Sequence, residues 1–493
     1  MSTEIKNLSV SGAAKLLNSG KISAVELCNA FIARIDAIDD QVKAFLKLDK
    51  AEVIAAAEAA DQRRNNGEQL SDFDGIPIAI KDCIVAEGQT CGCASKLLEN
   101  VVAPYDSTVV AKLRAKGFIP MGRVNMDEFA MGSTCENSAF QKTTNPWDTA
   151  RVPGGSSGGS AASVAASEVP AALGSDTGGS IRQPASFCGC VGLKPTYGRV
   201  SRYGLVAFAS SLDQIGPVTH SVLDAAIMLD TIGGHDKHDS TSLPEPCTGF
   251  ADAVKAMAGK DMTGIKIGLP KEYFSAAGLE PNIKAITDNA IATCKKLGAE
   301  IVEVSLPHTK YAISAYYIIA TAEASANLAR FDGIRYGARS PEANDLVDSY
   351  FKSRGAGFGD EVKRRILLGT YVLSSGYYDA YYLKAQKVRT LIRRDFENAA
   401  KECDILLTPV APSVAFKFGE KSDPLQMYLA DIFTIALNLA GNCGISVPAA
   451  IEPNSKMPVG IQLIAPALQE KKLLEVAAIF EANREQTEFA ANI

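Results

Sequence analysis

The sequence has little histidine and tryptophan and no excess of positive charge. Its 493 residues include four histidines and one tryptophan, and 56 acidic side chains outnumber 50 basic ones. The net charge of −6 argues against a broad basic face that holds nucleic acid by neutralising its phosphates. The small number of histidines also leaves few candidates for a mechanism in which histidine is the base.

Long apolar runs and C-x-x-C motifs are also absent. The richest apolar stretch, residues 429–445, is interrupted by Asp431, Asn438 and Asn442, so no membrane span is predicted. The 11 cysteines are scattered along the chain, which is typical of reduced thiols in a cytoplasmic protein. Two C-x-C pairs occur without histidines or carboxylates at ligand spacing, so no metal site is predicted.

The sequence does contain a regular alternation of helical and strand patterns. Roughly the first 70 residues are helical in pattern, with a capping box formed by Ser23 and Glu26. Further along, helical periodicity alternates with short apolar runs of strand type. These runs lie at residues 76–80, 118–121, 265–269, 300–304, 405–409 and 460–464. The pattern predicts an α/β fold in which a single large mixed β-sheet is surrounded by helices.

Residues 311–400 depart from this alternation. They are mainly helical in pattern and are predicted to form a helical cap region on the sheet. The chain has no internal repeat and no linker rich in proline, serine or charge, so we expect residues 1–493 to form one domain.

Residues 153–192 contain two loops rich in glycine and serine, flanked by apolar residues. A phosphate-binding loop requires lysine after the last glycine of the first loop, and Ser160 stands there instead. A nucleophile elbow at residues 155–159 would make Ser157 the nucleophile and requires a later aspartate and histidine. His220 and His308 are possible partners, but neither lies in a catalytic context.

A third interpretation joins both loops with Lys81. Each loop leads from an extended segment into a helix, which places successive backbone N–H groups around a concave point. Thr177, Gly178 and Gly179, together with Ser180, would present these N–H groups to an oxyanion. Glycine is favoured there because the backbone must approach the substrate closely.

These elements have the order and spacing of a known signature. Lys81 is followed by Gly-Gly-Ser-Ser-Gly-Gly and then by Asp-Thr-Gly-Gly-Ser-Ile-Arg, with Ser180 24 positions after Ser156. The pattern continues without a gap to residue 196 and resembles the amidase signature family. The resemblance implies a Ser–Ser–Lys triad without histidine, in which Ser180 is the nucleophile, Ser156 the bridging serine and Lys81 the base. It also implies a cis peptide bond before Ser156.

Lys81 must be uncharged to act as a base. Its reference pKa of about 10.4 would have to fall to roughly 7–8. The position at the end of the apolar run at residues 76–80 predicts desolvation, which lowers the pKa of a lysine.

Further motifs resemble one branch of that family, the A subunits of glutamyl-/aspartyl-tRNA amidotransferases. They lie at residues 123–133, 145–148, 323–333, 362–369 and 374–382. This resemblance implies a glutaminase that supplies ammonia for converting Glu-tRNA(Gln), Asp-tRNA(Asn) or both. It further implies two partners, the B subunit together with the small C subunit. The tRNA would be held mainly by the partner, and ATP and Mg²⁺ would be used through it, with no cofactor in this chain.

The resemblance also assigns a pocket for free glutamine. Arg364 would bind the carboxylate and Asp431 the ammonium group. Arg365 is an open alternative to Arg364, because three basic residues follow one another at this point. Asp431 has a second interpretation as a carboxylate at the N-terminus of a helix predicted at residues 432–440.

Two other functions remain compatible with the sequence. A free-standing amidase for a different small amide would share the triad and differ at the pocket. Arg364→Ala would separate this function from a glutaminase if the variant lost activity towards glutamine but kept activity towards neutral amides. A catalytically inert scaffold for other subunits would release no ammonia from glutamine, although Lys81, Ser156 and Ser180 are all present.

Overall fold

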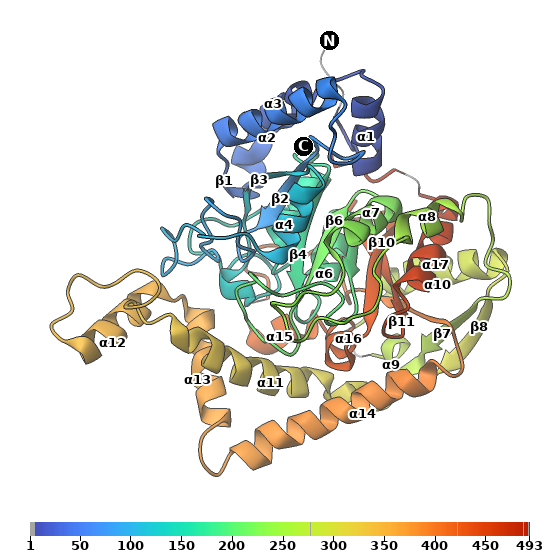
Figure 1. Ribbon diagram of the computed structural model, residues 1–493. Coiled ribbons are helices and arrows are strands. Elements are labelled where there is room, and N and C mark those ends of the chain that lie inside the picture. The colour runs from blue at the N-terminus through green and yellow to red at the C-terminus, as the bar shows by residue number, and fades with distance from the viewer. Residues whose placement is uncertain (1–4, 277, 422, 487, 492) are drawn as a thin grey trace.

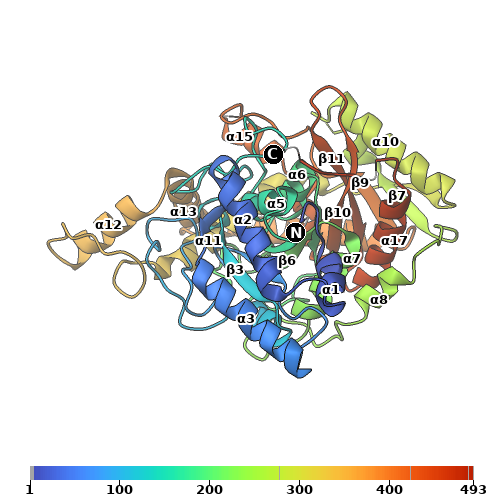
Figure 2. The ribbon, with the colours of Figure 1, turned by 90° about the horizontal axis from the view of Figure 1, so that it is seen from above.

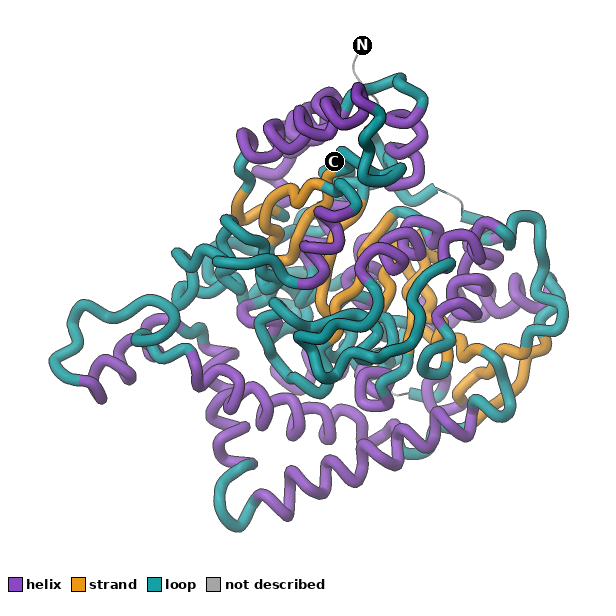
Figure 3. The backbone as a smooth tube through the Cα atoms, viewed as in Figure 1, coloured by secondary structure: helices purple, strands orange, loops and turns teal. Residues whose placement is uncertain are grey.

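The computed structural model describes residues 5–276, 278–421, 423–486, 488–491 and 493. Residues 1–4 of the predicted N-terminal helical segment lie outside this part. Strands occupy the middle of the molecule and helices surround them (Figure 1 and Figure 3). The α/β fold predicted from the sequence is therefore correct.

In the described part of the chain, eleven strands form one sheet with the order β1-β3-β2-β4-β6-β5-β10-β11-β9-β7-β8. The strands are β1 Phe45–Lys47, β2 Pro77–Lys81, β3 Ile119–Val124, β4 Ala171–Asp176, β5 Val191–Lys194, β6 Gln214–Thr219, β7 Lys266–Pro270, β8 Glu300–Val304, β9 Ile405–Pro409, β10 Cys443–Ile451 and β11 Pro458–Ala465. Strand β2 is parallel to both of its neighbours, β3 and β4, whereas β10 is antiparallel to β5 and β11. The sheet is therefore mixed, as predicted.

Helices cover both faces and one end of this sheet. The α-helices are α1 Val10–Asn18, α2 Ala24–Val42, α3 Lys50–Asn66, α4 Thr108–Ala115, α5 Gly158–Ala165, α6 Arg182–Cys188, α7 Val222–Ile232, α8 Phe250–Lys255, α9 Lys271–Phe274, α10 Pro281–Lys296, α11 Ala312–Asn327, α12 Leu346–Gly357, α13 Asp360–Val372, α14 Lys384–Ala399, α15 Pro424–Leu429, α16 Ile435–Ala440 and α17 Glu470–Asn483. Shorter turns are η1 Glu128–Ala130, η2 Thr309–Tyr311, η3 Leu328–Arg330 and the π-helical η4 Tyr378–Leu383.

The N-terminal helices begin where the sequence places their capping residues. The Ser23 side chain accepts from the backbone N–H of Glu26, and the Glu26 side chain accepts from the N–H of Ser23. This capping box satisfies two N–H groups that a helix start otherwise leaves unpaired. Helices α2 and α3 pack together at the end of the sheet near β1 and β3 (Figure 1).

Residues 311–400 contain helices and turns and no strand, as predicted for the cap region. Helices α11 and α13 pack against each other, and α14 runs along the same side of the molecule (Figure 1). Helix α12 projects from the body in both ribbon views (Figures 1 and 2). The assignment of residues 1–493 to one domain stays a prediction.

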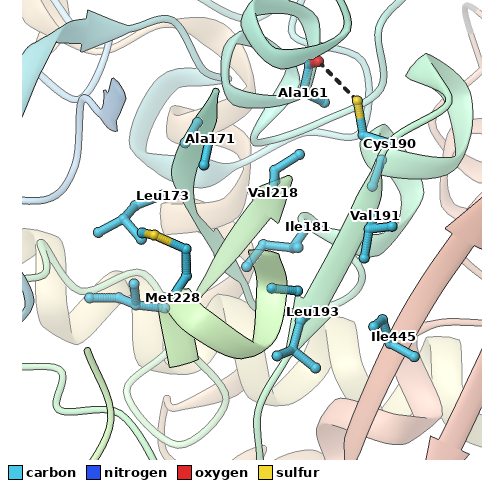
Figure 4. Packing of buried hydrophobic residues seen from close by; sticks show 14 of the residues in the cluster. Ala161, Ala171, Leu173, Ile181, Cys190, Val191, Leu193, Val218, Met228 and Ile445 are labelled. Carbon is cyan, nitrogen blue, oxygen red and sulfur yellow. Dashed lines mark hydrogen bonds between the residues drawn. The ribbon is translucent and has the colours of Figure 1, made fainter. Parts of the chain in front are cut away.

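The core beneath the signature segment is densely apolar. Leu173 of β4, Leu193 of β5 and Val218 of β6 pack together with Ile181 and Met228 (Figure 4). Burying each such side chain is worth about 1.5–3 kcal/mol. This packing fixes the end of β4, from which the second glycine-rich loop emerges.

Several boundaries differ from the sequence predictions. The pattern of residues 42–48 alternates as in a strand, but α2 continues to Val42 and β1 has only three residues. Helix α16 begins at Ile435 rather than residue 432. Strand β10 was not predicted, because its glycine, serine and proline residues obscure the apolar pattern. Among the described residues, no helix has both the length and the apolar character needed to cross a membrane.

Candidate active site

The side chain of Lys81 lies at the centre of the candidate site. Lys81 ends β2 and is fully buried. Its Nζ atom lies 2.7 Å from Ser156 Oγ, 2.8 Å from Ser157 Oγ and 2.9 Å from Ser175 Oγ. Three hydroxyl groups therefore surround an amine that reaches no solvent.

This environment changes the protonation of Lys81. Burial lowers the pKa of its amine, because the charged form loses the solvation it has in water. The nearby groups Cys83, Asp127, Cys135 and Asp176 oppose this effect. The net direction is towards the neutral amine, which is the form that can accept a proton.

Ser156 is held by the backbone on both sides. The peptide bond between Gly155 and Ser156 is cis, as the family resemblance implies. The Ser156 carbonyl accepts from the backbone N–H of Asp127 at 3.3 Å. The buried Asp127 carboxylate in turn accepts from three backbone amides of the loop that follows it, at 3.0–3.3 Å. One acidic side chain thus stabilises the loop beside the bridging serine.

Ser180 occupies the open side of this arrangement. It is 8% exposed, whereas Ser156 is fully buried. Its carbonyl accepts from the Ser157 N–H at 3.1 Å, which ties the two loops together. Within the described residues its hydroxyl makes no hydrogen bond, so the expected direct bond between Ser180 and Ser156 is not formed in this structure.

The turn before Ser180 presents backbone N–H groups of two kinds. The Gly179 N–H already donates to Asp176 Oδ1 at 2.8 Å. The N–H groups of Gly178 and Ser180 have no hydrogen-bond partner among the described residues. The Thr177 N–H group likewise has no hydrogen-bond partner among the described residues. Of the predicted donors, Thr177 and Gly178 therefore remain available, and Ser180 offers a further free N–H group.

Glycine is required at position 179 by the backbone conformation. Its φ angle of 129° lies in a region that residues with a Cβ rarely adopt. A Cβ atom there would also overlap the hydroxyl of Thr434, which precedes α16. The same hydroxyl donates to the Gly178 carbonyl at 2.7 Å.

A buried ion pair holds the other side of this turn. Arg182 donates through Nε and Nη2 to the two oxygens of Asp176, each at 3.0 Å. Burial by itself would raise the pKa of Asp176, but the charge and hydrogen bonds of Arg182, the charge of Lys194 and the Asn438 bond together lower it. Asn438 of α16 donates to Asp176 as well, at 2.8 Å. The ion pair therefore links the signature loop to α16.

Asp431 lies in a buried polar environment rather than at a helix cap. One carboxylate oxygen accepts from the Ser133 hydroxyl and the other from Gln183 Nε2 at 3.3 Å. Its side chain accepts no bond from the N–H groups of α16, so the capping interpretation is not supported. Burial raises its pKa to about 7, against the opposing effects of the Ser133 bond and the Arg365 charge.

The two neighbouring arginines of α13 have different environments. Arg364 has a side chain that is 47% exposed and pairs with Glu361 at the surface. Arg365 is buried, donates to Glu361 at 2.8 Å and stacks over Phe208 and Tyr317. The charge of Arg365 lowers the pKa of Asp431, which places its guanidinium close to this carboxylate. The geometry therefore favours Arg365, the alternative that the sequence left open.

The alternative Ser–His–Asp site is not assembled. Ser157 is buried, and its hydroxyl contacts Lys81 and the backbone of residue 175 instead of a histidine. His308 pairs with Asp395 near the start of α11. The Nε2 atom of the half-buried His220 is shielded from solvent, and this desolvation lowers the pKa of the histidine to about 4.

Three contacts were not predicted from the sequence. Ser175 contacts Lys81, Ser133 contacts Asp431, and the ring of Tyr316 lies against Gly178. Ser175 faces Lys81 because the strands β2 and β4 are adjacent, and only a strand assignment at residues 171–176 could have indicated this. No group of three or more metal-ligating side chains occurs in the part of the chain that the structure describes.

Comparison with known proteins identifies the class to which this fold and site belong. The family profile described as Amidase matches residues 26–474. The chain belongs to this amidase family.

Similarity to particular relatives is stronger still. The A subunit of the Glutamyl-tRNA(Gln) amidotransferase from Geotalea daltonii is 56% identical over 468 residues, which cover 95% of each chain. The corresponding protein of Fusobacterium nucleatum is 56% identical over 463 residues, or 94% of each chain. The crystal structure of the Thermotoga maritima counterpart has a TM-score of 0.81 and 41% identity, covering 98% of this chain and 97% of that one. The structure of 6-aminohexanoate cyclic dimer hydrolase in complex with its substrate has a TM-score of 0.84 at 25% identity, with 99% of each chain covered.

Proposed function

We propose that this chain is the glutamine-hydrolysing A subunit of a tRNA-dependent amidotransferase. The observation that carries the proposal is the buried contact of 2.7 Å between Lys81 Nζ and Ser156 Oγ, beside Ser180, which is 8% exposed. The names of the relatives that match over more than nine tenths of the chain support the same function.

The proposed reaction is an acyl transfer through Ser180. Neutral Lys81 takes the proton of Ser156, and Ser156 takes the proton of Ser180 as its side chain turns towards the bridging serine. Ser180 Oγ then forms a bond to the side-chain amide carbon of glutamine. The C–N bond breaks, the proton returns to the leaving nitrogen, and ammonia departs. Water next attacks the γ-glutamyl ester, which releases glutamate and restores Ser180.

The oxyanion of this reaction needs donors close to Ser180. The free N–H groups of Gly178 and Ser180 are suited to this role, whereas the Gly179 N–H is engaged by Asp176. Thr177 contributes its position in the turn, since its hydroxyl donates to Asp213. One such donor typically changes the rate by about 10²–10³-fold.

Free glutamine carries one carboxylate and one ammonium group. We assign the carboxylate to Arg365, whose forked guanidinium lies buried next to Tyr317. The ammonium group is assigned to Asp431, which lies close enough to Arg365 for the two charges to interact. A neutral amide without these two groups would gain nothing from this pocket, which favours glutamine as the substrate.

The ammonia would pass to partner subunits. In this proposal a B subunit holds the Glu-tRNA(Gln) and uses ATP and Mg²⁺ to activate it, while a small C subunit completes the assembly. The cap region offers a surface for such partners, because large apolar side chains on α12 and α13 are exposed to solvent. They are Leu346 (67% exposed), Val347 (64%), Phe351 (70%) and Leu367 (71%). Apolar patches of this kind are typical of protein interfaces.

Trapping the acyl-enzyme tests the proposal. The chain assembled with its partner subunits should release ammonia from glutamine, and mass spectrometry should find the γ-glutamyl group on Ser180. A label on Ser157, or no release of ammonia, would contradict it.

A free-standing amidase is the second candidate, favoured by the overall similarity to 6-aminohexanoate cyclic dimer hydrolase. It predicts turnover of neutral amides that is as fast as turnover of glutamine and unaffected by Arg365→Ala.

A further inference from the structure

The turn at residues 208–213 lies between the signature loop and the cap helices, and it has no part in the reaction described above. We propose that Asp213 is a positioning residue for residues 177–180, called here the oxyanion turn, and that Glu323 and Arg389 of the cap hold Asp213 in place. The inference rests on the proposed function only in treating the N–H group of Gly178 as an oxyanion donor.

Asp213 binds the oxyanion turn through one side chain of that turn, Thr177. Its Oδ1 atom accepts from the Thr177 hydroxyl at 2.8 Å, and Thr177 directly precedes Gly178. The same carboxylate accepts from the backbone N–H groups of Phe208 and Ala209 at 2.9–3.1 Å. Asp213 is 2% exposed, so no water competes for these bonds. The carboxylate thus fixes the oxyanion turn relative to its own turn.

The cap holds the other side of the same turn. Glu323 of α11 accepts from the N–H of Ser211 at 2.9 Å and from its hydroxyl at 2.6 Å. Arg389 of α14 donates to the Ser211 hydroxyl at 2.8 Å and to its carbonyl at 2.9 Å. Asn327, at the end of α11, donates to the Phe208 carbonyl at 3.1 Å. Two cap helices therefore determine where Asp213 lies.

Arg389 reaches Gly178 by a second route. Its Nε donates to the carbonyl of Leu439 in α16 at 3.0 Å. Helix α16 begins next to Thr434, whose hydroxyl donates to the Gly178 carbonyl. The Gly178 peptide is thus held from one side through Thr177 and from the other through Thr434, and both connections lead to α14. A change in the position of α14 would move the Gly178 N–H group away from the developing oxyanion.

This arrangement predicts an effect on kcat rather than on KM. The oxyanion forms only in the transition state, so its donors stabilise that state more than bound substrate. In the assembled enzyme, Asp213→Ala should lower kcat for glutamine about 10–100-fold, with KM within about twofold of wild type. Asp213→Asn keeps an acceptor for the Thr177 hydroxyl, so its kcat should fall less than that of Asp213→Ala.

A second readout does not depend on glutamine. An alkyl fluorophosphonate reacts when Ser180 Oγ bonds to phosphorus, fluoride leaves and the serine proton passes to Ser156. The phosphonyl oxygen then occupies the oxyanion position. Labelling of Ser180 should slow in Asp213→Ala by about the same factor as kcat. If the wild-type protein is labelled normally but does not hydrolyse glutamine, the proposed function is wrong. The labelling rate of Asp213→Ala relative to wild type still tests this inference in that case.

Asp74→Asn is the matched control. Asp74 is a fully buried carboxylate that binds Arg63 and the N–H of Leu70, away from the site. The Asp74→Asn substitution should lower the melting temperature without changing kcat or labelling of the folded protein.

The role of the cap in holding Asp213 is tested by Arg389→Ala. Its loss in kcat should not add to that of Asp213→Ala in the double variant. Normal labelling in Asp213→Ala, an equal loss in Asp74→Asn, or additive losses in the double variant would overturn the inference.

Discussion

The catalytic centre and the proposed glutamine pocket meet in one site but are built differently. Lys81, Ser156 and Ser180 come from strand ends and loops of the sheet core, where every neighbouring element is buried. Arg365 comes from a cap helix, and Asp431 from the segment between α15 and α16. The core part is held by the backbone, whereas the pocket depends on how separate helices pack. The chemistry is therefore fixed more rigidly than the specificity.

The largest effect is expected from removing the nucleophile. Ser180→Ala should reduce glutamine hydrolysis by at least about 10³-fold, because no acyl-enzyme can form. Ser157→Ala is the matched variant, since it removes a neighbouring hydroxyl that also contacts Lys81. It should retain acyl-enzyme formation, measured by mass spectrometry after a glutamine pulse. The reverse result would assign the reaction to the nucleophile-elbow interpretation.

Removing the base should have the next largest effect. Lys81→Met keeps the volume of the side chain and should lower kcat by about 10²–10⁴-fold. Because Lys81 is buried, the fold should tolerate the neutral residue, and circular dichroism would check this. If the activity of Lys81→Met were close to that of the wild-type protein, the buried amine would not be the base, and the proposed proton transfer from Ser156 to Lys81 would be wrong.

The candidate catalytic centre was predictable from the sequence because its residues lie in continuous motifs of fixed spacing. Strand β2, which ends at Lys81, has a simple apolar pattern. The choice between Arg364 and Arg365 could not be made in this way. It depends on the rotation of α13 against Phe208 and Tyr317, which lie far away in sequence.

Contacts across the sheet were equally invisible in the sequence. Ser175 meets Lys81 only because β4 lies beside β2, and that order belongs to the topology of the sheet. The occupation of the Gly179 N–H by Asp176 likewise requires the folded turn. The sequence thus predicted that Lys81, Ser156 and Ser180 form the candidate site, but not the side chains that hold them.

The two arginines provide the sharpest test of the pocket. Arg365→Ala should raise KM for glutamine about 10–100-fold, because a charge-assisted hydrogen bond contributes about 1.5–3 kcal/mol. Arg364→Ala should change KM less than about threefold, since an exposed pair contributes little. Steady-state kinetics of ammonia release measures both. A larger effect from Arg364 would mean that α13 presents its other face to the substrate.

The smallest expected effect is the pH dependence of glutamine binding through Asp431. Only the ionised carboxylate pairs with the ammonium group, and burial raises the pKa of Asp431 to about 7. Arg365 and Lys421 favour the ionised form, whereas Asp176 opposes it. As the pH falls through 7 the carboxylate takes up a proton, so KM should rise about tenfold between about pH 8 and about pH 6. Asp431→Asn should give a high KM without this dependence, and a neutral amide substrate should show none with either protein. A wild-type KM that stays constant over this range would mean that Asp431 does not bind the ammonium group. In that case Arg365 of α13 would be the one charged residue of the proposed pocket that selects glutamine.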